Sequence, residues 1–146
     1  MIRRTFLSGL IASALLAAAT PALAAKAKAK PIPRQGVVIQ VSDDSEKTWN
    51  QALNVARNIQ KAYGADKVDV ELVVFGNGFG MLKFDSPLAN RVGDAAASGV
   101  NLLMCENSMR ANKLEHADMH DKIGYVPAGV VEIIEKQKQG WAVIRP

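Results

Sequence analysis

The chain contains the stretch Gly99-Val-Asn-Leu-Leu-Met-Cys-Glu-Asn-Ser108, an apolar run that ends at Cys105, the only cysteine among 146 residues. A short apolar run that follows a glycine and gives way to polar residues is typical of a buried strand. The polar residues after Cys105 are common at helix starts. The pattern therefore predicts a strand over residues 100–104, a helix over about residues 107–115, and a single thiol at the junction between them.

Apolar runs and amphipathic helical patterns alternate on both sides of this stretch. Further strands are expected at residues 37–41, 68–75, 123–126 and 141–144, and further helices at about residues 45–63, 87–98 and 127–139. Strands that alternate with helices of this length favour right-handed crossovers and a parallel arrangement. The predicted fold class is α/β, a doubly wound, five-stranded, mostly parallel sheet with helices on both faces.

Three segments carry narrower expectations. The last helix is expected to bury Val130, Val131 and Ile134, its apolar residues at helical spacing. Residues 76–80, Gly-Asn-Gly-Phe-Gly, lack the spacing of a dinucleotide fingerprint and are expected to form a flexible turn that approaches the site or a neighbouring subunit. Residues 117–122 are polar and are expected to form a loop.

The strand order 2-1-3-4-5, common in doubly wound sheets, would place a ligand crevice between strands one and three. That order would bring Ser42 and Asp43, which follow the first strand, next to Cys105. Backbone N–H groups at the helix start would stabilise a thiolate, whereas the carboxylate of Glu106 would raise the pKa of the thiol. Position alone leaves open whether Cys105 is a core residue, a nucleophile or carrier, or half of an intermolecular disulfide.

The first 35 residues have the composition of a targeting segment and a tether. Residues 1–24 combine Arg3 and Arg4, an apolar stretch and an Ala-x-Ala motif, which is typical of a secretory signal peptide. Both the twin-arginine and the Sec export routes fit this segment. Residues 25–35 are rich in lysine and proline and are expected to form a flexible linker. We therefore expect a bacterial periplasmic protein with one domain, residues 36–146, and no membrane span after removal of the signal.

The charge distribution argues against a nucleic-acid partner. Six of the 18 lysines and arginines precede residue 36, so the 14 acidic residues outnumber the basic ones in the predicted domain. Nucleic-acid binding requires basic charge that is clustered on the folded surface. A single cysteine also argues against a fold held together by disulfides.

Several motifs together match one known family. They are Ser42-Asp43 after the first strand, Gly76-Asn77-Gly78 after the second, the run that ends at Cys105, and a tail from Val126-Pro-Ala-Gly-Val-Val131 through Gln139-Gly140-Trp141 to Pro146. On these residues the chain resembles the DsrE/DsrF-like sulfur-relay family, in its exported branch. The resemblance implies a flavodoxin-like, DsrE-like domain over residues 36–146 and assembly into homotrimers or homohexamers. It also implies an active cysteine at the position of Cys105, although many members of the family lack it.

The resemblance implies a sulfur carrier or cysteine-persulfide sulfurtransferase that accepts sulfane sulfur on Cys105. Its partners would be small sulfur donors or acceptor thiols, and thiol exchange requires no metal or organic cofactor. The residues predicted to bind around the thiol are Ser42, Asp43, Asn77, Asn107 and Ser108. The alternative function is a non-catalytic oligomeric binding module of the same fold, in which Cys105 is structural.

His116 and His120 are the only candidate metal ligands that the sequence singles out. They stand four residues apart, and on a helix this spacing would place both imidazoles on one side, as in a zinc or copper site. The polar segment around them favours a solvated loop instead, and no metal is expected. A histidine that assists Cys105 as a proton donor is the other interpretation of this pair.

Overall fold

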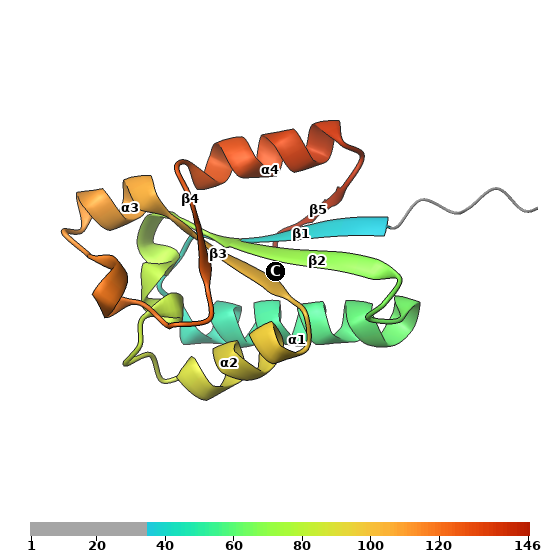
Figure 1. Cartoon of the computed structure of the whole chain (residues 1–146), viewed down its shortest axis with the longest axis horizontal. Coiled ribbons are helices and arrows are strands. Elements are labelled where there is room, and N and C mark those ends of the chain that lie inside the picture. Colours follow the sequence, from blue (N-terminus) through green and yellow to red (C-terminus); the bar gives the residue numbers. More distant parts are fainter. Residues whose placement is uncertain (1–34) are drawn as a thin grey trace, which may run out of the picture. The chain divides into compact units, whose positions relative to one another are not determined.

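All five strands of the central sheet run parallel. Figure 1 shows this sheet between layers of helices. The computed structural model describes residues 35–146, and the predicted signal peptide and most of the predicted linker lie outside the described residues. The strands are β1 (Gln35–Val41), β2 (Val68–Val74), β3 (Asn101–Cys105), β4 (Gly124–Val126) and β5 (Ala142–Ile144). The structure confirms the predicted α/β class and the five-stranded sheet.

The strand order is β4-β3-β2-β1-β5, so the predicted order 2-1-3-4-5 is wrong. β2 lies between β1 and β3, and Glu71 of β2 is in register with Val38 on one side and Asn101 on the other. The first three crossovers all step in the same direction, and only the last one returns across the sheet to β1. Hydrophobic periodicity indicates that a segment is a strand, but it does not indicate on which side of its predecessor the strand will pair.

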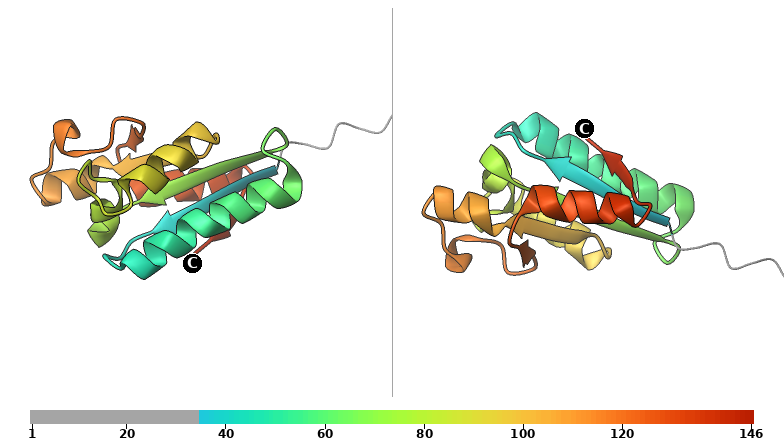
Figure 2. Two further views of the ribbon diagram at one scale, coloured as in Figure 1. Left: turned by 90° about the horizontal axis from the view of Figure 1, so that it is seen from below. Right: turned by 90° about the horizontal axis from the view of Figure 1, so that it is seen from above.

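Helices cover the two faces of the sheet unequally. The helices are α1 (Glu46–Tyr63), α2 (Ala89–Ala97), α3 (Glu106–Ala111) and α4 (Gly129–Lys138), with 3₁₀ segments η1 (Gly76–Leu82) and η2 (His116–Asp118). Figure 2 shows α1 and α2 on one face and α4 alone across the other. The larger core lies between the sheet and α1 and α2, and a smaller core that includes Val38, Val73 and Ile133 lies under α4.

Local sequence explains the start and the end of α1. The N–H of Thr48 donates to Oγ of Ser45, the N-cap residue, and the N–H of Ser45 donates to Oδ1 of Asp43. Side-chain caps of this type satisfy N–H groups that have no partner within the helix. Gly64 ends the helix with a φ of 92°, a conformation that glycine adopts without a steric penalty.

The predicted inner face of α4 is wrong. Val130, Val131 and Ile134 are 52%, 54% and 44% exposed, whereas Gly129 and Ile133 are buried. The face that meets the sheet carries a glycine, which permits close approach, and Lys136, which pairs with the buried carboxylate of Glu71 at 2.9 Å. Counting apolar residues therefore selects the wrong side of this helix.

Two segments near the carboxyl ends of the strands differ from the prediction. The segment after β2 is more regular than a flexible turn, and the helix after β3 is shorter than expected. The expected flexible turn at residues 76–80 is part of the 3₁₀ segment η1, in which Gly78, Met81 and Leu82 are buried. The helix predicted over about residues 107–115 is shorter, because α3 ends at Ala111, and its buried residue is Met109. Both segments pack at the carboxyl end of the sheet. Within residues 35–146, no helix has the length and apolar character that crossing a bilayer requires.

Candidate functional site

Cys105 is the last residue of β3 and the N-cap residue of α3. It pairs in register with Val126 of β4, and Met104 beside it pairs with Val74 of β2, so the thiol lies between the carboxyl ends of two neighbouring strands. Its residue is 4% exposed. The strand and the helix predicted around this thiol are both present, and the junction between them holds the cysteine.

The start of α4 also lies next to Cys105. A Cβ placed on Gly129 would lie 3.3 Å from Cβ of Cys105, 3.1 Å from Cβ of Phe75 and 3.2 Å from Cγ1 of Val73. These distances are tighter than ordinary van der Waals contact, so only glycine fits here without displacing its neighbours. The backbone N–H of Gly129 is thereby within reach of the sulfur.

Burial raises the pKa of the Cys105 thiol, but hydrogen bonds to the sulfur outweigh this effect and the pKa is lowered from its ordinary value of 9.0. The donors are the backbone N–H of Gly129, the hydroxyl and the backbone N–H of Ser108, and the backbone N–H of Asn107. Donors that point at sulfur favour its charged form. A thiolate at this position is therefore easier to form than in a free cysteine.

Ser108 connects the thiol to the glycine-rich segment. Its Oγ accepts a hydrogen bond of 2.7 Å from the N–H of Gly76, which leaves the hydroxyl proton for the sulfur of Cys105. The next N–H, that of Asn77, donates to the carbonyl of Ser42 at 3.2 Å. Residues 76–78 thus tie the end of β1 to the start of α3.

The structure separates the predicted site residues into two groups. Ser108 and the backbone N–H of Asn107 act on the sulfur, whereas Ser42 and Asp43 follow β1 and are kept from Cys105 by β2. The carboxylate of Asp43 accepts from the N–H of Ser45, the N-cap residue of α1, and the carbonyl of Asp43 accepts from the Trp49 indole. The prediction that Ser42 and Asp43 lie next to the thiol depended on the wrong strand order, and only the carbonyl of Ser42 is linked to the site, through Asn77.

The side chains of Asn77 and Asn107 do not point to a role at the sulfur. Asn77 is exposed and contributes its backbone N–H to Ser42. The side-chain oxygen of Asn107 accepts a hydrogen bond from Arg110. The backbone N–H of Asn107 also donates to the carbonyl of Pro127 at 3.3 Å. Gly129 was missed by the sequence analysis, although a glycine at a helix start after a strand is a signal of close backbone approach.

The two histidines face different parts of the molecule. Nε2 of His116 lies 3.6 Å from Oε1 of Glu106, and its ring stacks on Tyr125 with a centroid distance of 3.8 Å. Nδ1 of His120 lies 3.1 Å from Oδ1 of Asp121. In the part of the chain that the structure describes, no three His, Cys, Asp or Glu side chains gather as a metal site would require.

The model of the DsrE/DsrF-like family matches residues 36–146. The chain belongs to this family. Its members are generally associated with sulfur relay, a chemistry that requires a reactive sulfur atom. The one cysteine of this chain, Cys105, lies at the end of β3.

Solved structures agree with the family assignment. MTH1491 from Methanobacterium thermoautotrophicum, a protein of unknown function, is 28% identical with a TM-score of 0.73, over 77% of this chain and 99% of that chain. The ychN protein from E. coli is 12% identical with a TM-score of 0.63 over 77% and 99%, and BT1422 from Bacteroides thetaiotaomicron, also of unknown function, is 13% identical with a TM-score of 0.64 over 77% and 95%. The last two share the DsrE-like fold alone. A comparison with curated proteins found no match.

Proposed function

We propose that this DsrE/DsrF-like protein carries sulfane sulfur on Cys105. The observation that supports the proposal is the set of hydrogen-bond donors around the only thiol, which lowers its pKa although the residue is buried. The thiolate is the nucleophile in sulfur exchange, so a lowered pKa increases the reactive fraction at neutral pH. The same donors would stabilise the anionic form of a persulfide on Cys105.

In the transfer step, the Cys105 thiolate attacks the outer sulfur of a donor persulfide, R–S–SH. A bond forms between Sγ and that sulfur, the S–S bond of the donor breaks, and the donor leaves as the thiolate RS⁻. An acceptor thiolate then attacks the outer sulfur of the Cys105 persulfide, and the Cys105 thiolate is regenerated. The two exchanges balance without a metal, an organic cofactor or an external oxidant.

The burial of Cys105 favours small donors over protein donors. The residue is 4% exposed, but Gly76 and Asn107, which belong to the segments that surround it, are exposed. The exposed Asn107 gives its backbone N–H to the sulfur, which supports access to the thiol at the carboxyl edge of the sheet. An inorganic polysulfide needs a smaller opening there than the side chain of a protein persulfide.

The proposal includes export to the bacterial periplasm and assembly into a homotrimer or homohexamer. Export is supported by the composition of residues 1–24. Assembly is supported by Val130, Val131 and Ile134, which expose apolar side chains on α4 directly after Gly129. Cell fractionation tests the compartment. Light scattering of the purified protein and of a Val131→Glu variant tests the assembly, since a charge at a buried contact should yield smaller particles.

The decisive experiment is the intact mass of the folded protein after treatment with inorganic polysulfide. We expect a gain of about 32 Da for each sulfur that Cys105 accepts, and release of that mass by an acceptor thiol. Cys105→Ser is the matched control, because it removes the sulfur and keeps a small polar side chain. A protein that gains no mass while folded would refute the carrier function.

The non-catalytic binding module remains the second candidate because Cys105 is only 4% exposed. It predicts that iodoacetamide fails to label Cys105 until the protein unfolds. The carrier predicts labelling of the folded protein at a rate that increases with the thiolate fraction. The rate of labelling in native buffer therefore separates the two functions.

A further inference from the structure

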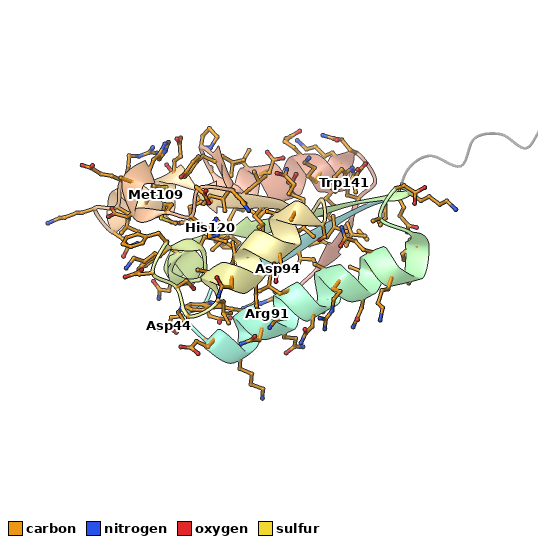
Figure 3. The ribbon with its side chains drawn as sticks, turned by 60° about the horizontal axis from the view of Figure 1, so that its bottom comes forward. Asp44, Arg91, Asp94, Met109, His120 and Trp141 are labelled. Carbon is orange, nitrogen blue, oxygen red and sulfur yellow. The ribbon has the colours of Figure 1, made fainter. Side chains whose placement is uncertain are left out.

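A cavity of about 180 Å³ lies between α1 and α2, at the amino end of β3, whereas Cys105 lies at the carboxyl end of that strand. Its buried lining is apolar and comes from Leu53, Ala56 and Val100. Its more exposed lining is polar and includes Arg57, Arg91 and Asp94. Figure 3 labels Arg91 and Asp94 where α2 passes α1.

Side-chain bridges between the two helices hold the cavity open at both ends. At one end, Nε2 of Gln60 donates to the carbonyl of Ser98 at 2.8 Å. At the other end, the Arg91 guanidinium donates to the side-chain oxygens of Asn50 and Asn54. The space is therefore formed by fixed contacts before any ligand enters, which lowers the entropic cost of binding.

Two arginines that line this cavity, Arg57 and Arg91, donate to the same neutral oxygen, which belongs to Asn54 next to Leu53 of the lining. Oδ1 of Asn54 accepts from Nη2 of Arg91 at 2.8 Å and from Nη2 of Arg57 at 3.2 Å. Within residues 35–146, neither arginine has a carboxylate within ion-pair distance. Like charges this close repel each other. Each guanidinium also retains N–H donors that these bonds do not use, since it carries five.

We propose that this cavity binds a small organic monocarboxylate. Its carboxylate lies against the guanidiniums of Arg57 and Arg91, whose planar forks match that group, and its short apolar body covers Leu53, Ala56 and Val100. Asp94, on α2 one turn after Arg91, adds one negative charge to the same cavity. That charge selects against ligands with two negative charges.

The test is an NMR titration of the purified protein with butyrate, followed through the backbone amides of residues 54–60 and 91–98. We expect saturable shifts with butyrate, weaker binding of phosphate, and none with butylammonium. Arg57→Gln and Arg91→Gln should each weaken butyrate binding about tenfold or more, because a hydrogen bond to a charged group is lost. Asp94→Asn should strengthen binding, since it removes a repulsive charge.

Arg110→Gln is the matched control, because Arg110 also donates to an asparagine oxygen but lies on α3, outside the cavity. Its butyrate affinity should equal that of the unmodified protein. Arg91→Lys keeps the positive charge and the aliphatic part of the side chain but removes the planar guanidinium. If Arg91→Gln fails to fold, weaker butyrate binding by Arg91→Lys therefore tests the role of the guanidinium. Cys105→Ser should bind butyrate normally, which keeps this proposal independent of sulfur transfer. Four results would overturn the proposal of a carboxylate site. They are shifts that do not saturate with butyrate, equal binding of butylammonium, tighter binding of phosphate, and full butyrate affinity in both Arg57→Gln and Arg91→Gln.

Discussion

Cys105 owes its lowered pKa to hydrogen-bond donors and not to a neighbouring cation. The one charged residue next to it in the chain is Glu106, whose carboxylate lies beside His116 at 3.6 Å. The hydroxyl of Ser108 is the only side-chain group among these donors, so it can be removed without changing the backbone. It is therefore the residue through which the reactivity of the thiol can be altered most cleanly.

Ser108→Ala should raise the pKa of Cys105, because it removes a hydroxyl that donates a hydrogen bond to the sulfur and favours the thiolate. The measurement is the rate of iodoacetamide alkylation as a function of pH. Ser98→Ala is the control, since Ser98 also donates a hydrogen bond, to the carbonyl of Ala95, but lies in the α2 region. An unchanged alkylation profile in Ser108→Ala would show that the hydroxyl does not act on the sulfur.

At the scale of single residues, the sequence was informative where a side chain is unusual in the chain. Cys105 was found because it is the only cysteine, and Ser108 because it follows Cys105 in the helix start. Gly129 was missed because its contribution is the absence of a side chain, and this has meaning only once Phe75 and Val73 are known to lie beside it. Ser42 and Asp43 were wrongly placed near the thiol because their position depends on strand order.

At the scale of elements, the start of α4 and the middle of α2 each contain a glycine, in different surroundings. A Cβ at Gly129 would meet three side-chain atoms at 3.1–3.3 Å, whereas a Cβ at Gly93 would meet only His120, at 3.5 Å or more. Gly129→Ala should therefore destabilise the protein by about 1–3 kcal/mol through overpacking. Gly93→Ala should stabilise it by about 0.5–1 kcal/mol, because alanine is the better helix former. Urea unfolding of both variants measures the difference, and destabilisation by Gly93→Ala would contradict this account.

The orientation of α4 depends on a charged pair under the helix. Oε2 of the buried Glu71 lies 2.9 Å from Nζ of Lys136 and accepts from Nδ2 of Asn101, and Nζ of Lys136 also lies 4.3 Å from the Trp141 ring centre. Such a pair is hard to recognise from sequence, because a lysine on a helix normally indicates the solvated side. This explains why Val130, Val131 and Ile134 were predicted to face inward.

Lys136→Met should destabilise the protein by about 3–5 kcal/mol, because it leaves the carboxylate of Glu71 buried without its cation. Lys138→Met is the matched control on the same helix. Lys138 pairs with Glu135 at 2.7 Å, but both side chains are more than half exposed, so the loss should be about 0–1 kcal/mol. Denaturant unfolding of the two variants gives both values. Equal losses would mean that the buried pair does not determine how α4 packs.

At the scale of the whole molecule, the class of the fold could be predicted and the order of its strands could not. The alternation of strands and helices follows from local periodicity, whereas the order depends on the direction of each crossover. Because β2 separates β1 from β3, the site is built from the ends of β2, β3 and β4 and from the starts of α3 and α4. The cavity between α1 and α2 lies at the other end of β3, near Val100.

The lowered pKa of Cys105 also links the stability of the whole fold to pH. A group whose pKa is lower in the folded state contributes stability that is fully present above its unfolded value, here 9.0, and is lost as the pH falls through the folded value. The free energy of unfolding of the unmodified protein, minus that of Cys105→Ser, should therefore increase as the pH rises towards 9.0. Lys136, whose pKa is raised above 10.5 mainly by Glu71 against the effect of burial, keeps its charge throughout this range. Urea unfolding of both proteins from pH 6 to pH 9 measures the difference, and a difference that falls with rising pH would show that the fold favours the neutral thiol.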